Sequence, residues 1–373
     1  MEKSNTIYLK GLNGIRAIAA LGVLLSHTNL ALKHFNVTNY SLFGFGSKGQ
    51  QLSYILGRHG VTMFFVLSGF LITFLLLKEI DKAKKIDIKS FYIRRILRIW
   101  PLYFLYFGLC LLFLYIFKDE IPPGTTLLYY IFFLANIPFV GGFANHLFAH
   151  LWSIAVEEQF YLFWPHLFRY KEKLIKIVIG LIILQGAIRV VLWGLFPHSF
   201  IATLSSVNRF DCMMIGGLGA ILLYKRSRVI DFLNNKRVQI FSWAVVFSMI
   251  FNFFKVVASV VEFWIVSFVT IVVIIGQVID TNKIINLENK FFNFFGILSF
   301  GIYVYHPLVI YLLRKSELLL IIDDEFTRAV SLFILIITLT TFIAWLSYTY
   351  IESQFLKLKY KFQIIKSTNK DIK

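Results

Sequence analysis

Long apolar segments recur along almost the whole chain and are separated by short polar stretches. An α-helix needs roughly 20 apolar residues to cross about 30 Å of hydrocarbon, and segments of that kind extend from near residue 12 to near residue 351. They predict about ten spans, at residues 12–30, 59–77, 99–117, 151–168, 174–196, 209–224, 238–254, 260–279, 292–313 and 327–351. The pattern therefore predicts an all-α fold, a polytopic transmembrane helical bundle.

Residues 127–140 form one further apolar run, which is short and is broken by Asn136 and Pro138. Such a run is typical of a re-entrant or interfacial segment. The alternative is an eleventh span, which would move every later loop to the opposite side of the membrane.

Composition and charge agree with a membrane protein. Of 373 residues, 58% are hydrophobic and 16% are charged, and the mean hydropathy of +0.73 is far above that of a water-soluble domain. The net charge of +18 does not indicate nucleic-acid binding, because with ten spans 26 of the 38 Lys and Arg residues fall on the side of the N-terminus. By the positive-inside rule, we expect both termini in the cytoplasm.

The chain is expected to form one integral membrane domain, residues 1–358, with a short polar cytoplasmic tail, residues 359–373, and no extra periplasmic domain. Its two cysteines, Cys110 and Cys212, fall inside predicted spans and lack metal-ligand spacing. We therefore expect neither a disulfide nor a metal site.

Ionisable residues inside the predicted spans are the first candidates for function, because each costs at least about 2.5 kcal/mol to place at membrane depth. Arg16 and His27 are 11 residues apart in the first span, so they share one helix face at depths about 16 Å apart. A deep arginine usually pairs with a carboxylate or an anionic ligand, since its guanidinium keeps its charge. The alternative for His27 is an interfacial histidine near a helix end.

The fourth predicted span carries Glu157 and Glu158 about 9–11 Å below its outer end, close to the expected depth of His27. A carboxylate beside an imidazole orients the ring and raises its basicity, which gives a general-base pair. Adjacent helical residues point about 100° apart, so we expect at most one glutamate to serve directly. The alternative for either is a structural ion pair with a buried arginine.

The ninth predicted span contains the string SFGIYVYHP, with Tyr305 and His306 directly before Pro307. A proline inside a helix frees a backbone carbonyl and bends the helix, and bends at membrane depth often line cavities. His306 is equally explained as a core histidine that is bonded to the freed carbonyl.

The loop before the third predicted span is strongly basic and ends in FYIRRILRIWP. Arg95 and Arg98 stand on one helix face at the cytoplasmic entrance, and such a pair suits bidentate binding of phosphates. Topology anchoring or anionic lipid headgroups explain the remaining positive charge of the loop.

These motifs belong to five longer strings: GLNGIRAIAALGVLLSHT, FFVLSGFLIT, FYIRRILRIWPLYF, LWSIAVEEQFYLFWP and SFGIYVYHPLVI. Together, from residue 11 to about residue 351, the chain resembles the membrane-bound acyltransferase family 3, the family of bacterial surface-polysaccharide O-acetylases. By this resemblance, the family's functional residues fall on Arg16, on His27 as the catalytic histidine, on Arg95 and Arg98, and on Glu157 and Glu158.

The resemblance implies a transmembrane O-acyltransferase in the bacterial cytoplasmic (inner) membrane, with no permanently bound cofactor. Its co-substrate would be cytoplasmic acyl-CoA, by default acetyl-CoA, and its acceptor a hydroxyl of an extracytoplasmic polysaccharide, glycolipid or other molecule. We expect Arg95 and Arg98 to hold the nucleotide phosphates while the pantetheine arm passes Arg16. His27, oriented by one of the two glutamates, would then take the proton of the acceptor hydroxyl; an acyl-histidine intermediate is the alternative.

Residue type gives four candidates for stabilising the oxyanion: Arg16, Ser153, Tyr305 and His306.

Two other classes of function remain open at this point. A glycan or lipid transporter or flippase also has many helices with buried charges, although matching half-repeats are not evident here. A receptor-like or assembly protein would use the arginines to bind anionic lipid.

Overall fold

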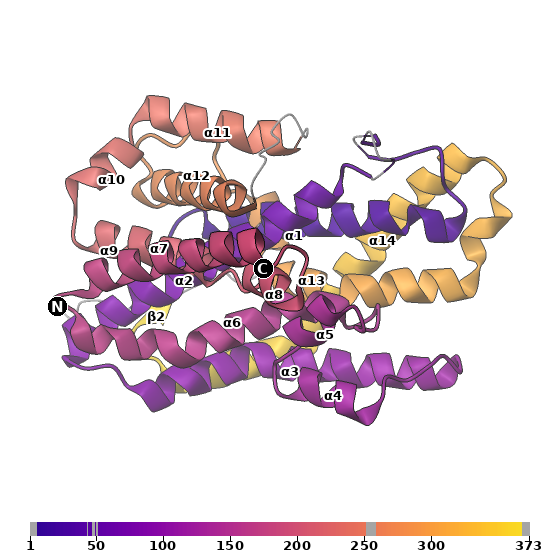
Figure 1. The fold of residues 1–373 in the computed structure, drawn as a ribbon, viewed down its shortest axis with the longest axis horizontal. Coiled ribbons are helices and arrows are strands. Elements are labelled where there is room, and N and C mark those ends of the chain that lie inside the picture. The colour runs from indigo at the N-terminus through magenta and orange to yellow at the C-terminus, as the bar shows by residue number, and fades with distance from the viewer. Residues whose placement is uncertain (1–5, 43, 47–48, 50, 251–258, 368–373) are drawn as a thin grey trace.

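The structure is a computed structural model that describes residues 6–42, 44–46, 49, 51–250 and 259–367. Most of these residues are helical (Figure 1). The α-helices are α1 (Leu12–Ala31), α2 (Tyr54–Ala83), α3 (Ile88–Ile116), α4 (Gly124–Ile131), α5 (Asn136–Gly141), α6 (Trp152–Phe163), α7 (Leu174–Leu195), α8 (Phe200–Val207), α9 (Phe210–Tyr224), α10 (Arg228–Leu233), α11 (Lys236–Ile250), α12 (Ser259–Ile279), α13 (Lys290–Ser316), α14 (Glu325–Ser347) and α15 (Ser353–Lys359).

Shorter elements connect these helices. The 3-10 helices are η1 (Leu32–Phe35), η2 (Ala149–Leu151), η3 (Trp164–Tyr170), η4 (Leu318–Ile321) and η6 (Tyr360–Phe362), and η5 (Tyr348–Glu352) is a π-helix. Two short strands, β1 (Thr6–Ile7) and β2 (Lys366–Ser367), pair in parallel.

Within the described residues, eight helices are long and apolar enough to cross a membrane, and each corresponds to a predicted span. They are Leu12–Phe35, Tyr54–Ala83, Ile88–Ile116, Leu174–Leu195, Phe200–Tyr224, Val260–Ile279, Lys290–Ser316 and Glu325–Phe362. The predicted fold class, an all-α polytopic helical bundle, is therefore confirmed.

The other two predicted spans have a different form. The span predicted at 151–168 consists of the 12-residue α6 between η2 and η3, and Pro165 stands where α6 gives way to η3 because proline cannot donate an α-helical hydrogen bond. The span predicted at 238–254 begins in α11, and its end lies outside the described residues.

The apolar run 127–140 does not form a crossing helix. It is divided between α4, which has eight residues, and α5, which has six. The backbone turns between them at Phe133, where φ is 54°. Since eight residues of α-helix cover only about 12 Å, this segment is not an eleventh span.

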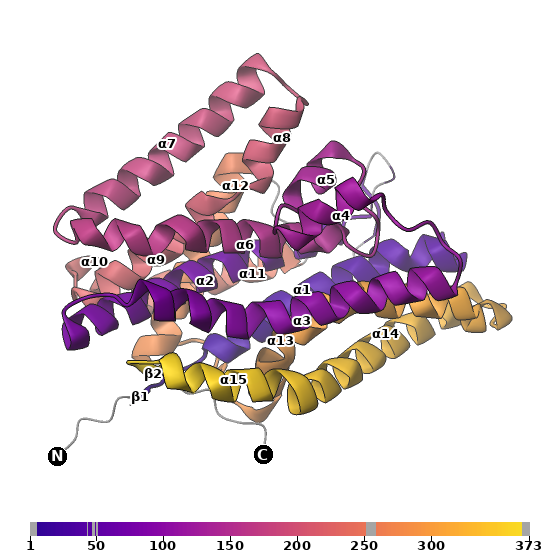
Figure 2. The same ribbon diagram turned by 90° about the horizontal axis from the view of Figure 1, so that it is seen from below.

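The loops predicted to lie inside meet at one end of the molecule. The ammonium of Lys10 lies 2.6 Å from a carboxylate oxygen of Asp280, and Asn234 Nδ2 donates to Thr281 Oγ1 at 2.8 Å. Hydrogen-bonded ion pairs with Lys10 and Lys283 lower the pKa of Asp280 to about 2. The β1–β2 pair lies at this end, beside α15 (Figure 2).

The loops predicted to lie outside meet at the opposite end. Lys315 Nζ lies 2.6 Å from Asp119 Oδ1, and Asn39 Nδ2 donates to Glu325 Oε2 at 2.6 Å. Loops that were predicted to lie on the same side of the membrane thus contact one another, as the predicted topology requires. Which end faces the cytoplasm stays a prediction from the charge distribution.

Helices α1, α2, α9 and α13 pack closely at the centre of the molecule, while α7 and α8 form a layer to one side (Figure 2). A Cβ added to Gly69 would overlap the backbone of Met213, and one added to Gly216 would overlap the backbone of Val66. The two glycines thus allow α2 and α9 to approach to backbone contact.

Candidate active site

An outer cavity of about 780 Å³ is lined by several histidines, three of which lie close together. His27 of α1, His306 of α13 and His150 of η2 all line it. The distance between His27 Nδ1 and His306 Nε2 is 2.6 Å, and the ring centroids of His150 and His306 are 5.4 Å apart. Three spans therefore contribute imidazole rings to one cluster.

A backbone carbonyl fixes the tautomers in this cluster. His306 Nδ1 lies 3.2 Å from the carbonyl oxygen of Ile302; because a carbonyl can only accept, this nitrogen carries the proton and the Nε2 of the neutral ring accepts. We infer that His27 donates to His306 from Nδ1 and holds its lone pair on Nε2. Among the described residues His27 Nε2 has no hydrogen-bond partner, so this nitrogen is available to act as a general base in the outer cavity.

Tyr303 and Ser153 stand between the outer cavity and a second, inner cavity. Their hydroxyl oxygens are 2.6 Å apart, and the Tyr303 hydroxyl donates to the carbonyl of His150 at 2.8 Å. Both side chains line the inner cavity, while the ring of Tyr303 lies 6.0 Å from that of His306 on the outer side. A thin layer of side chains thus separates the two cavities.

The inner cavity is narrow, about 90 Å³ in volume, and rich in positive charge. Arg16, Arg95 and Arg98 line it, and Glu157 is the carboxylate among the described lining residues. Arg16 donates to the side chain of Asn13 at 3.1 Å and forms no ion pair within the described part of the chain. Three guanidinium groups facing one carboxylate make this a site suited to an anionic ligand.

The prediction that Glu157 or Glu158 contacts His27 is wrong. Glu157 accepts a hydrogen bond from Ser68, and Glu158 accepts one from the indole of Trp100 at 3.3 Å. Glu157 lines the inner cavity whereas Glu158 does not. This division follows from the different directions in which adjacent helical residues point.

The cause of this error is the depth at which the fourth span begins. His150, just before α6, is already level with His306 in the outer cavity. Glu157 follows His150 by seven residues, which places it about 10 Å nearer the inner face. The carboxylate therefore reaches the arginines and not the histidines.

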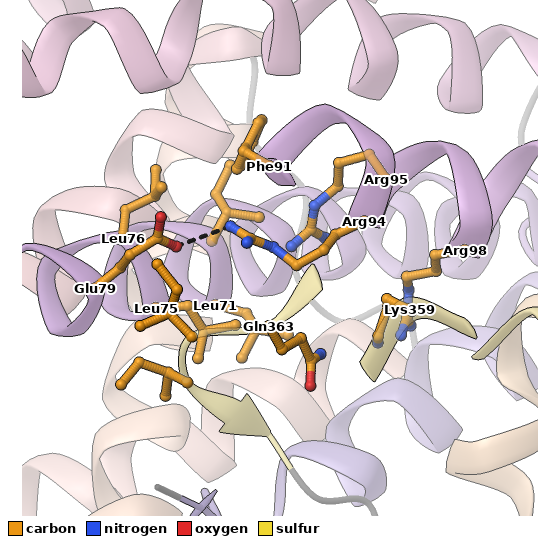
Figure 3. A pocket seen from close by; sticks show the side chains of 13 residues that line it. Leu71, Leu75, Leu76, Glu79, Phe91, Arg94, Arg95, Arg98, Lys359 and Gln363 are labelled. Atoms are coloured by element: carbon orange, nitrogen blue, oxygen red, sulfur yellow. Dashed lines mark hydrogen bonds and ion pairs between the residues drawn. The ribbon is translucent and has the colours of Figure 1, made fainter. Parts of the chain in front are cut away.

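A pocket at the inner end continues the inner cavity, and the two share Leu71, Ile72, Arg95 and Arg98. Figure 3 shows Arg95 and Arg98 facing this pocket. Neither has an ion pair among the described residues, and Arg95 Nε is buried without a hydrogen-bond partner. The predicted arginine pair is thus brought together, and neither guanidinium is neutralised by an ion pair with a described residue.

Arg94, the neighbour of this pair, has a structural role. Its Nη2 lies 2.9 Å from Glu79 Oε2, and its Nη1 donates to the carbonyl of Phe362 at 2.8 Å. It does not line the inner cavity. Two other arginines buried in the membrane, Arg189 and Arg209, are likewise bonded to protein groups.

Tyr305, a predicted oxyanion donor, lies away from both cavities and donates to Ser347 Oγ at 3.1 Å. Tyr303, which lies in the string SFGIYVYHP, and His150 take positions at the site, although neither was among the predicted site residues. Helix periodicity could have indicated Tyr303, because residues 303 and 306 lie on the same helix face and residue 305 does not. His150 precedes the WS dipeptide by two residues, but no spacing rule linked it to His306.

A family model described as an acyltransferase domain matches residues 9–349. The chain belongs to this acyltransferase family. The match covers both the histidine cluster and the arginines of the inner cavity in one domain.

Two curated relatives of this acyltransferase come from Staphylococcus aureus. O-acetyltransferase OatA of strain NCTC 8325 / PS 47 is 35% identical over 167 residues, which are 42% of this chain and 24% of that protein. The protein named "Putative O-acetyltransferase SACOL0978" of strain COL is 27% identical over 378 residues, 94% of this chain and 58% of that protein. The acyltransferase therefore spans less than two thirds of either relative. No solved structure matches it.

Proposed function

We propose that this acyltransferase moves an acyl group, by default acetyl, from cytoplasmic acyl-CoA to a hydroxyl of an extracytoplasmic polysaccharide, glycolipid or other acceptor. The observation that carries the proposal is the arrangement of two cavities on either side of Tyr303 and Ser153. One is cationic and opens toward the inner end, and the other presents His27 Nε2. The names of the two relatives support acetyl as the group and a hydroxyl as its acceptor.

On the donor side, acyl-CoA brings phosphate groups at one end and a thin pantetheine arm at the other. Arg95 and Arg98, which lack carboxylate partners in the described residues, would bind the phosphates at the inner pocket. The pantetheine arm would follow the narrow inner cavity past Arg16 to Ser153. A cavity of about 90 Å³ suits a linear chain better than a sugar ring.

On the acceptor side, the hydroxyl would enter the outer cavity and hydrogen-bond to His27 Nε2. As its oxygen forms a bond to the thioester carbonyl carbon, His27 takes the hydroxyl proton. The C–S bond then breaks, the sulfur leaves as the thiolate of CoA, and the proton passes to it. Ser153 and Tyr303 lie between the two cavities, and either hydroxyl would donate to the oxyanion by exchanging its present hydrogen bond.

The experiment that tests this function uses inside-out vesicles that hold the wild type, His27→Ala or His198→Ala at matched expression. His198 is exposed, lies outside both cavities and serves as the control histidine. Acetyl-CoA consumption and capture of the acetyl group by membrane glycans are measured. We expect the wild type and His198→Ala to transfer acetyl groups and His27→Ala to lose at least about 10²-fold in rate.

Two results would contradict the proposal. If the wild type neither binds nor consumes acyl-CoA, transport of a glycan or lipid becomes the better explanation. If His27→Ala transfers acetyl groups at the wild-type rate, His27 is not the general base.

A further inference from the structure

The segment from α15 to Ile365 forms one wall of the inner pocket. Lys359 and residues 363–365 line this pocket together with Arg95 and Arg98. In Figure 3, Lys359 lies beside Arg98. Residues 359–373 were expected to be a short polar cytoplasmic tail, but Lys359 and residues 363–365 line this pocket in the structure.

This wall is held in place by contacts that do not involve Lys359. Arg94 donates to the carbonyl of Phe362 at 2.8 Å, and Lys82 donates to that of Ile364 at 3.3 Å. The pairing of β1 with β2 fixes the backbone just beyond. The ammonium of Lys359 is therefore held in the pocket and is not needed to anchor the segment.

The charges of the pocket are unbalanced. Glu79 compensates Arg94, whereas Lys359, Arg95 and Arg98 have no ion-pair partner within the described residues. Three cations that converge without an ion pair to any of them among the described residues repel one another until an anion binds between them. Their number suits a ligand with more than one phosphate group.

We propose that Lys359 is a third phosphate-binding residue of the donor site and that the segment Ser353–Ile365 covers the nucleotide end of the bound acyl-CoA. This inference rests on the proposed function, because it takes acyl-CoA as the donor. It assigns recognition of the donor to a segment outside the motifs that carry the family resemblance.

The test measures KM and kcat for acetyl-CoA and for acetyl-pantetheine, which lacks the phosphates and the nucleotide. The variants are Lys359→Ala, Lys359→Arg and Lys357→Ala. Lys357 lies in the same last turn of α15, is exposed and does not line the pocket, so it is the matched control. Thermal unfolding of each purified variant checks that the fold is retained.

Lys359→Ala is expected to raise KM for acetyl-CoA roughly tenfold with little change in kcat, because a charge-assisted contact to phosphate is lost. Its KM for acetyl-pantetheine should equal that of the wild type. Lys359→Arg should restore most of the affinity, and Lys357→Ala should behave as the wild type.

An equal rise in KM for both donors would overturn the inference, because the effect would then not depend on phosphate. An unchanged KM for acetyl-CoA in Lys359→Ala would overturn it as well. Either result leaves the proposed function intact as long as the wild type consumes acetyl-CoA; a wild type that consumes neither donor refutes the function itself.

Discussion

The hydrogen bond between His27 and His306 determines which nitrogen of His27 can accept a proton. The Ile302 carbonyl sets the proton on His306 Nδ1, and this sets the lone pair of His27 on the nitrogen that faces the outer cavity. His306 thus acts as a positioning residue in place of the expected carboxylate.

Replacing His306 by Ala should lower kcat by about 10²- to 10⁴-fold and leave KM for acetyl-CoA nearly unchanged, because the orientation and tautomer of His27 are lost. His306→Gln, whose side-chain oxygen can accept from His27 Nδ1, should recover part of the rate. Steady-state kinetics of both variants across a pH range provide the measurement. Equal rates for His306→Gln and His306→Ala would argue against hydrogen bonding as the role of His306.

Glu157 allows a second test. The sequence predicted that it orients His27, whereas the structure places it among the arginines of the inner cavity. As a partner of Ser68 among the arginines of the inner cavity, Glu157 should affect donor binding. Glu157→Gln should therefore change KM for acetyl-CoA, while the pH dependence of kcat keeps its shape. A loss of kcat as large as that of His27→Ala, with KM unchanged, would restore the pairing that the sequence predicted.

The sequence predicted correctly which residues share a helix face, but it did not predict how deep Glu157 lies in the protein. The spacing of Arg95 and Arg98, and of Arg16 and His27, could be converted into shared faces because helix periodicity is regular. The depth of Glu157 could not be read, because hydropathy does not show that η2, just before α6, already lies beside His306. Lys359 was missed because a polar sequence gives no sign that its backbone folds back onto α3.

At the scale of helices, the contact between α2 and α9 is the most sensitive to added volume. Gly216→Ala should destabilise the protein by about 1–3 kcal/mol, since its Cβ would overlap the backbone of Val66. Gly180→Ala in α7, where a Cβ has open space, should be neutral or stabilising by up to about 1 kcal/mol. Thermal unfolding in detergent measures both; the packing argument fails if the two substitutions have the same effect.

The long helices were predictable from hydropathy, while the broken ones were not. Apolar windows locate α2 or α13 because each is long and continuous. The turn at Phe133 and the change to a 3-10 helix near Pro165 depend on local packing and backbone geometry. Hydropathy alone reports how apolar such segments are, but not how many helices they form.

For the molecule as a whole, the predicted orientation can be tested by labelling. Cys110 and Cys212 are both buried, so single cysteines at exposed positions should dominate the signal. A membrane-impermeant maleimide added to intact cells should label Glu120→Cys at the end with the outer cavity, and label Lys225→Cys only after permeabilisation. The opposite pattern would place the arginine pocket outside and remove its access to cytoplasmic acyl-CoA.

The pairing of β1 with β2 also has a consequence for biosynthesis. Thr6 and Ile7 precede the described spans in the chain, but their partners Lys366 and Ser367 are made only after all of these spans. The pocket wall that contains Lys359 is therefore completed only after those spans. Under the proposed function, a nascent chain whose helices are still being inserted would therefore bind the donor poorly and consume little acyl-CoA.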